Sequence, residues 1–164
     1  MITFFDHLAV EEIGRWRDLL EKEVRPYLQE DRAYYASQYR QVCWLEEQWN
    51  PATRTLTSAL SVPRLWQLLQ SRFPWANIGL VSYGNMGIKP HRDDSYCTSL
   101  AGGVNLGSCI FEYWDDRTTP GTIDYKKLKL ESGEVYTFNA KCKHAASSCA
   151  NDRWIINVWK KKLK

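Results

Sequence analysis

Two of the three histidines in the sequence are spaced as metal ligands would be. His91 begins the tripeptide His91-Arg92-Asp93. Residues i and i+2 of a β-strand project from the same face, so His91 and Asp93 can converge on one point. His144 lies at the start of a later predicted strand, which a jelly-roll sheet can bring beside the first pair. These three side chains predict a metal site.

Two imidazoles and one carboxylate on one face of a metal ion leave its other coordination positions open. This arrangement is typical of non-haem Fe(II) oxygenases, in which the open positions allow O2 chemistry. A His-x-Asp tripeptide alone is weak evidence for such a site, because short patterns also arise by chance.

Arg153 strengthens the prediction. It follows His144 by nine residues and begins the run Arg153–Trp159, which is largely apolar and reads as a buried strand. A buried arginine requires an anionic partner, and its planar guanidinium pairs with a carboxylate through two hydrogen bonds. We therefore expect Arg153 to hold the distal carboxylate of a dicarboxylate cosubstrate. The alternative is a surface arginine at the start of a strand.

A second interpretation keeps the metal and changes the chemistry. Cys142 and His144 form another i, i+2 pair, which together with His91 and Asp93 could complete a closed four-ligand zinc site. Such a site would be structural and would leave no coordination position open. A third interpretation is a jelly-roll binding module that binds no iron and has no catalytic activity. The five cysteines include no C-x-x-C pair, so the sequence predicts neither a zinc ribbon nor a disulfide framework.

From Trp75 onward, short runs rich in β-branched and aromatic residues alternate with turn signals such as Ala101-Gly102-Gly103. Seven or eight short strands in about eighty residues favour a double-sheet jelly roll or a barrel. The predicted strands are Asn77–Tyr83, Ile88–Asp93, Gly103–Leu106, Cys109–Trp114, Lys126–Leu130, Glu134–Phe138, His144–Ser147 and Arg153–Trp159.

The first half of the chain has a different pattern. Apolar residues recur at three- and four-residue steps from Asp6 to about Glu30, which predicts an amphipathic helix that Pro26 kinks or ends. Tyr34–Leu45 is consistent with a strand, and a second helix is expected from Pro63 through Phe73 with Ser61 as its cap. We expect one α+β domain over residues 1–164, with mainly helical support in 1–74 and a jelly-roll core in 75–160.

Composition narrows the class of protein. Hydrophobic residues at 44% and charged residues at 25% argue against a disordered or fibrous chain. The net charge of +3 permits an anionic partner without requiring one. The apolar stretches are far shorter than the roughly 20 residues that cross a bilayer, and the N-terminus lacks the pattern of a signal peptide. We expect a cytoplasmic protein without a membrane partner.

The chain resembles the Fe(II)- and 2-oxoglutarate-dependent dioxygenases from about Asn77 to Trp159. The segments that carry the resemblance to AlkB-type members are Tyr83, Gly87–Asp94, Val104–Gly107 and Phe111–Tyr113, while GEVYTFNAKCKHA and DRWIINVW are similar to prolyl-hydroxylase-type members. The resemblance implies a double-stranded β-helix.

The resemblance also implies roles for individual residues. His91, Asp93 and His144 would bind Fe(II), Arg153 would pair with the distal carboxylate of 2-oxoglutarate, and Tyr83 would hydrogen-bond that cosubstrate. The implied reaction consumes O2 and 2-oxoglutarate, hydroxylates or oxidatively demethylates a substrate, and releases succinate and CO2. Because the carboxylate of Asp93 is retained, halogenation is disfavoured.

The sequence departs from the AlkB-type pattern at three points. The asparagine expected two residues before the tyrosine is Val81, the spacing from Tyr83 to His91 is one residue shorter, and no second arginine follows Arg153 at the end of its strand. These departures weaken the expectation of nucleic-acid demethylation. A nucleic acid, a peptide and a small molecule therefore remain open as the prime substrate.

Overall fold

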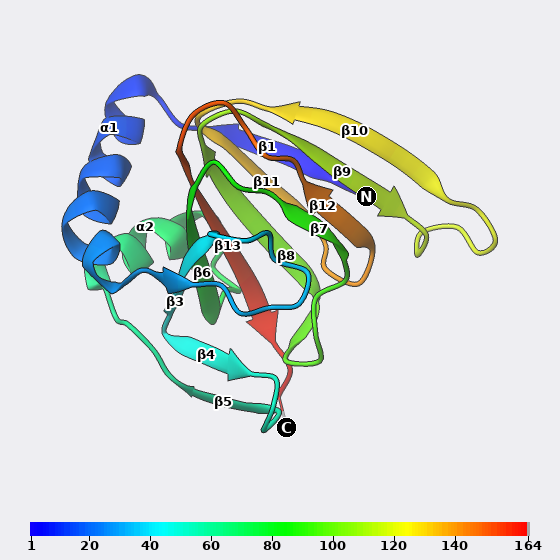
Figure 1. The fold of residues 1–164 in the computed structure, drawn as a ribbon. Coiled ribbons are helices and arrows are strands. Elements are labelled where there is room, and N and C mark those ends of the chain that lie inside the picture. Colours follow the sequence, from blue (N-terminus) through cyan, green and yellow to red (C-terminus); the bar gives the residue numbers. More distant parts are fainter. Residues whose placement is uncertain (164) are drawn as a thin grey trace.

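Antiparallel sheets are the main secondary structure of the computed structural model, which describes residues 1–163 (Figure 1). Within this range the larger sheet has seven strands in the order β1 (Thr3–His7), β11 (Glu134–Asn139), β8 (Cys97–Leu106), β13 (Arg153–Lys161), β6 (Ile78–Gly84), β3 (Gln41–Leu45) and β2 (Gln29–Glu30). The smaller sheet of the described chain has the order β10 (Asp124–Leu130), β9 (Cys109–Asp115), β12 (Lys143–Ala146) and β7 (Ile88–His91). A separate hairpin joins β4 (Glu47–Asn50) to β5 (Thr55–Ser58).

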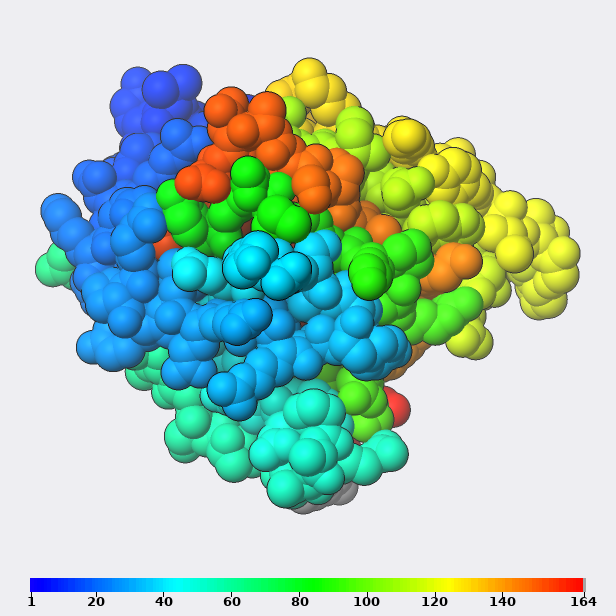
Figure 2. Space-filling model, in the orientation of Figure 1, coloured from blue at the N-terminus to red at the C-terminus, as the bar shows by residue number. Residues whose placement is uncertain are grey.

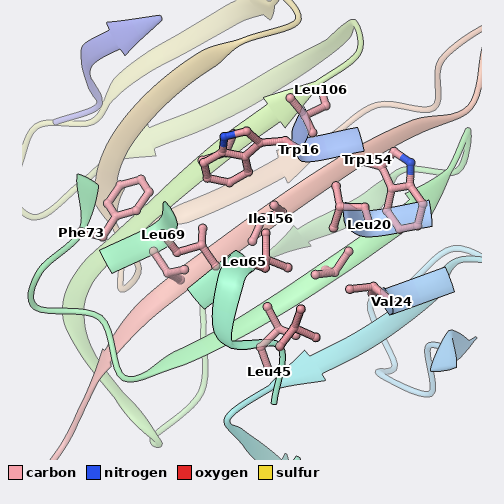
Figure 3. Packing of buried hydrophobic residues seen from close by; sticks show 14 of the residues in the cluster. Trp16, Leu20, Val24, Leu45, Leu65, Leu69, Phe73, Leu106, Trp154 and Ile156 are labelled. Atoms are coloured by element: carbon pink, nitrogen blue, oxygen red, sulfur yellow. The ribbon is translucent and has the colours of Figure 1, made fainter. Parts of the chain in front are cut away.

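Two helices cover the outer face of the larger sheet. Helix α1 (Val10–Leu19) continues through a π-helical turn (Leu20–Val24) into a short 3-10 turn (Arg25–Tyr27), and α2 is Pro63–Arg72. Their buried side chains pack against Trp154 and Ile156 of the sheet (Figure 3). This apolar packing determines which face of β13 is turned toward the helices. Among the described residues, no helix is both long and apolar enough to span a membrane.

A second core, rich in aromatic side chains, lies on the opposite face of the larger sheet, toward the smaller one. Phe111 and Tyr113 of β9 pack there with Tyr136 and Phe138 of β11. Alternation along β13 explains the division, since Trp154, Ile156 and Val158 belong to the helix side while Ile155 and Trp159 belong to the second core. Arg153 shares the face of Ile155, so it points toward the space between the sheets.

The predicted strands of the second half are all present, with ends that differ by one or a few residues. The main error is in β8, which begins at Cys97 rather than Gly103, so the predicted turn at Ala101-Gly102-Gly103 is wrong. Close packing explains these glycines. A Cβ on Gly102 would lie 2.4 Å from the ring of Phe73, and a Cβ on Gly103 would lie 2.4 Å from Tyr136.

The first 74 residues contain more strand than the sequence predicts. Strands β1, β2 and β3 join the larger sheet, and β4 and β5 form the hairpin. The first helix begins at Val10 rather than Asp6, because Asp6 pairs in β1 with Val135. The Ser61 cap is wrong as well. Val62 holds the N-cap position of α2 without a side-chain hydrogen bond, and the Ser61 hydroxyl donates to Glu46.

Of the predicted strand Tyr34–Leu45, only Gln41–Leu45 is extended within a sheet. Residues 31–40 instead form a segment, here called the strap, that crosses from β2 to β3. Ala36 bridges to Ile88, and the Lys89 amide donates to the Tyr35 carbonyl oxygen at 2.9 Å. In Figure 2 this light-blue segment lies on the viewed face beside the green residues around β7. The strap therefore covers one side of the space between the sheets.

Candidate metal centre and cavity

The three predicted metal ligands meet between neighbouring strands of the smaller sheet. Strand β12 pairs with β7, and His144 lies directly opposite His91 in that register. Strand β7 ends at His91, so Asp93 lies in the following turn, where its amide donates to the Ala140 carbonyl oxygen at 2.9 Å. All three side chains are buried. Residues separated by about fifty positions thus come together through strand pairing.

The ligand atoms have the separations that one cation requires. His91 Nε2 lies 3.4 Å and His144 Nε2 lies 3.5 Å from Asp93 Oδ1, and the candidate ligand atoms all lie within 4.8 Å of one another. Ligands bound at roughly 2.0–2.2 Å in adjacent octahedral positions are separated by about 3 Å. Contraction around an ion would bring the three atoms to that spacing. They would then occupy one face of the ion.

Backbone carbonyl groups set the tautomer of both histidines. His91 Nδ1 lies 2.8 Å from the Lys89 oxygen, and His144 Nδ1 lies 2.9 Å from the Cys142 oxygen. A carbonyl oxygen only accepts hydrogen bonds, so each Nδ1 carries a proton and donates it. A metal ion binds the neutral form of such an imidazole, in which the lone pair is on Nε2 and faces the candidate site.

Trp159 orients the carboxylate of the candidate site. Its indole Nε1 donates to Asp93 Oδ2 at 2.8 Å, which leaves Oδ1 facing the two imidazoles. Burial by itself raises the pKa of Asp93, but His144 and His91 more than offset that effect and hold the pKa well below its ordinary value. The carboxylate is therefore ionised and ready to bind a cation.

Replacing Trp159 with phenylalanine should weaken metal binding while the fold persists. The substitution removes the indole donor but keeps an aromatic ring, and loss of such an outer hydrogen bond costs roughly 10- to 100-fold in metal affinity. Isothermal titration with Mn(II) measures the change. Trp44→Phe is the matched control, because Trp44 packs on Trp159 with ring centroids 6.1 Å apart, whereas the indole that bonds Asp93 in the described chain is that of Trp159. Equal affinities of the two variants would contradict this role of Trp159.

The candidate metal ligands line a cavity of about 110 Å³ between the sheets, and Arg153 lines it too. The Arg153 side chain is only 5% exposed. Its Nη2 donates to the Ser147 carbonyl oxygen at 3.4 Å, whereas its Nη1 is buried without a partner among the described residues. Burial, together with repulsion from Arg40, lowers the pKa of Arg153 to about 10, so the group stays cationic at neutral pH. A buried cation with an unsatisfied donor requires an anion.

A second arginine, which sequence reasoning missed, faces the same cavity. Arg40 forms an ion pair with Asp31 across the ends of the strap, and its Nη2 donates to Ser82 Oγ at 2.8 Å. Arg40 and Ser82 are both buried. The local pattern does not mark this group, because Arg40 lies in Tyr34–Leu45, which reads as a regular strand.

The structure does not bring the Tyr83 hydroxyl to the other predicted site residues. Tyr83 pairs with Trp154 across β6 and β13 and packs against the helix-side core. Although Tyr83 borders the cavity, its hydroxyl donates to Asp152 at 3.3 Å, and the Arg25 guanidinium lies 4.1 Å from its ring centre. Ser82, one residue earlier, is the β6 residue whose side chain reaches Arg40. Cosubstrate binding by Tyr83 stays a prediction.

Cys142 lies outside the ligand group. The candidate cluster found among the described residues contains His91, Asp93 and His144 but not Cys142. The Cys142 thiol instead lies 3.9 Å from Asp115 Oδ1. The geometry therefore gives no support to the four-ligand zinc site.

Tyr35 is a further neighbour of the site that the sequence did not reveal. Its ring stacks on that of His91, with centroids 4.1 Å apart and planes inclined by 7°. Stacking from the strap restricts rotation of the imidazole about its side-chain bonds. The strap thus supports a candidate ligand as well as covering the cavity.

Comparison with known proteins places this architecture in a structural class. No family model and no curated protein sequence matches the chain. Among solved structures, OsALKBH1 superposes with a TM-score of 0.68 at 13% identity, covering 94% of this chain and 93% of that one. The non-heme alpha-ketoglutarate-dependent carbocyclase SnoK from nogalamycin biosynthesis has a TM-score of 0.67 at 11% identity, covering 97% of this chain and 79% of that one.

A prolyl-4-hydroxylase from Pseudomonas putida superposes with a TM-score of 0.62 at 10% identity, covering 99% of this chain and 93% of that one. A protein of the 2OG-Fe(II) oxygenase family from Burkholderia pseudomallei gives the same TM-score at 13% identity, covering 93% of this chain and 78% of that one. The chain therefore has the fold of the 2OG-Fe(II) oxygenases. At these identities the likeness establishes the fold and leaves the reaction to be argued from the site.

Proposed function

We propose that this protein is an Fe(II)- and 2-oxoglutarate-dependent oxygenase with a double-stranded β-helix core. The observation that carries the proposal is the buried Nη1 of Arg153, which has no partner within residues 1–163 and lies in the same cavity as His91, Asp93 and His144. Three ligands on one face suit a cation with open positions, and the guanidinium suits a carboxylate held at a distance from that cation. A dicarboxylic 2-oxo acid satisfies both requirements.

In this proposal the protein's own residues bind and orient the reactants. His91, Asp93 and His144 hold the iron through Nε2, Oδ1 and Nε2, while Arg153 fixes the far end of 2-oxoglutarate. Bound iron supplies the oxidising chemistry, in which O2 and 2-oxoglutarate yield succinate, CO2 and a hydroxylated or demethylated product. The surrounding aromatic side chains limit the entry of water, which protects reactive species from side reactions.

The charges around the cavity support binding of the metal and the cosubstrate together. Asp31 and Asp93 contribute two negative charges, and Arg40 and Arg153 contribute two positive charges. A divalent cation or a dianion alone would leave two uncompensated charges in a largely buried space, whereas the pair restores neutrality. We therefore propose that the metal and 2-oxoglutarate each increase the affinity for the other.

The test is succinate formation. The purified protein is loaded anaerobically with Fe(II), mixed with 2-oxoglutarate and exposed to O2, and succinate is measured against a no-enzyme control. Uncoupled turnover without a prime substrate is sufficient for the measurement. The proposal fails if succinate does not exceed the control and the visible absorption of an iron–2-oxoglutarate chelate is also absent. A preference for zinc with no response to 2-oxoglutarate would instead favour the structural-zinc alternative.

Gly107→Ala should impair cosubstrate binding and leave metal affinity unchanged. A Cβ at this position would lie 2.3 Å from the Cβ of Arg153, so the arginine would have to move. We expect an increase of at least about tenfold in the Kd for 2-oxoglutarate, since a misplaced guanidinium loses charge-assisted hydrogen bonds. Titration of the Mn(II)-loaded protein measures the effect. Gly14→Ala is the control, because outside its chain neighbours and its own helical backbone no described atom lies within 4 Å of its added Cβ. An unchanged Kd in Gly107→Ala would show that Arg153 does not bind the cosubstrate.

A further inference from the structure

Four aromatic side chains form a wall at one end of the cavity, here called the aromatic end: Trp44 of β3, Trp49 of β4, Tyr96 and Trp159 of β13. Trp44 and Tyr96 have ring centroids 5.8 Å apart, and Trp49 and Tyr96 have centroids 5.5 Å apart. Trp44 and Trp49 are only half-buried. Side chains from β3, from β13, from the β4–β5 hairpin and from the turn after β7 thus converge on one part of the cavity.

The aromatic end lies directly beside the candidate metal ligands. Trp159 belongs to the wall and also donates its indole proton to Asp93. Its ring lies 5.8 Å from that of Tyr96, centroid to centroid. A group held against this wall would therefore lie next to the candidate metal site, on the side of the Asp93 carboxylate.

Two of the three indoles in the wall already use their polar atoms. Trp159 Nε1 is bonded to Asp93, and Trp49 Nε1 donates to Asp94 Oδ2 at 3.0 Å. These rings are left to present apolar surface to a ligand. The wall therefore favours a ligand that binds through apolar contact rather than through ion pairs.

The charged groups that line the cavity already have other roles. Arg40 is paired with Asp31, Arg153 is assigned to the cosubstrate, and the rest belong to the candidate metal site. Among the lining residues this leaves no side chain to neutralise an ionic group at the aromatic end. Bringing an unpaired charge into such a space costs several kcal/mol, on the order of what a small ligand gains by binding.

We propose that the part of the prime substrate that enters the aromatic end, beside the candidate metal site, is an uncharged and mainly apolar group such as an aromatic ring or an alkyl chain. This inference rests on the proposed function, because it assigns the other end of the cavity to 2-oxoglutarate. The β4–β5 hairpin carries Trp49 and is tied to the turn after β7 by a hydrogen bond of 3.2 Å from Arg54 to Ser95. The hairpin is therefore the element that selects the substrate.

Three probes of matched size test the proposal: benzyl alcohol, benzoate and benzylammonium. Each is titrated into protein loaded with Mn(II) and 2-oxoglutarate, and paramagnetic relaxation of the probe's protons reports both affinity and closeness to the metal. We expect benzyl alcohol to bind at least about tenfold more tightly than either ion. Benzoate or benzylammonium binding near the metal as tightly as benzyl alcohol would overturn the proposal. A preference for benzylammonium would indicate recognition of a cation by aromatic faces instead.

Variants of the aromatic end test whether its side chains contact the probe. Trp49→Ala should weaken benzyl alcohol binding at least about fivefold, since it removes aromatic contact area, and Trp44→Phe should weaken it less. Trp114→Ala is the control, because Trp114 packs with Tyr125 on β10 and does not line the cavity. Equal binding by wild type, Trp49→Ala and Trp44→Phe would overturn the proposal. Benzyl alcohol binding that depends on Trp49, in protein that takes up no metal, would support the apolar pocket while overturning the proposed function.

Discussion

Replacing His91 with alanine is expected to lower the affinity for Fe(II) by at least about 100-fold. Loss of an outer-shell hydrogen bond already costs roughly 10- to 100-fold, and loss of a ligand removes a bond to the metal itself. The buried Asp93 carboxylate would also lose one of the two imidazoles that stabilise its charge. Anaerobic titration with Fe(II), followed by the visible absorption of the chelate with 2-oxoglutarate, measures the loss.

His7→Ala is the matched control for this experiment. His7 is an exposed histidine on β1 and lies outside the candidate ligand cluster. We expect its Fe(II) affinity to equal that of the wild type. An His91→Ala protein that remains folded and binds Fe(II) as tightly as His7→Ala would refute the assignment of the metal site.

Arg153→Met is expected to weaken 2-oxoglutarate binding by at least about 30-fold while leaving Fe(II) affinity nearly unchanged. Truncating one partner of a buried, hydrogen-bonded charge pair costs about 2–5 kcal/mol, and a tenfold change corresponds to about 1.4 kcal/mol. The apolar methionine fills much of the same volume and removes the unpartnered Nη1, so the apoprotein should not lose stability. Titration of the Mn(II)-loaded protein with 2-oxoglutarate gives the Kd, and thermal unfolding gives the stability.

Arg64→Met provides the comparison, since Arg64 is exposed on α2. The two variants remove the same charge, so a general electrostatic effect would change both affinities alike. A 2-oxoglutarate affinity retained in Arg153→Met would show that the buried guanidinium serves another anion.

The features that could be predicted from the sequence are those that depend on residues close together in the chain. The His91-Arg92-Asp93 spacing, the strand around His144 and the apolar run after Arg153 are local features, and strand pairing brings them together as expected. The helix Pro63–Arg72 is also marked locally, by a proline at its first position. In these places local preference and the folded structure agree.

The errors arise where distant contacts decide the outcome. Gly102 and Gly103 look like a turn in sequence, yet they are strand residues that make room for the rings of Phe73 and Tyr136. Arg40 and Ser82 come from segments separated by 42 residues, so their hydrogen bond leaves no local signature. In β6 both faces are buried against different cores, so alternation could not indicate whether Ser82 or Tyr83 faces the cavity.

Strand β7 has only four residues and lies at the edge of its sheet, where its pairing with β12 is irregular. It carries one of the candidate metal ligands, His91, and its partner strand carries another, His144. A bound ion would therefore hold β7 against β12. Removing the ion should make local opening of β7 more frequent. Hydrogen–deuterium exchange at Ile88–His91 is expected to accelerate in the metal-free protein, while exchange in the central strand β13 stays slow. Loading the ion would then set the rigidity of the cavity's rim before any substrate arrives.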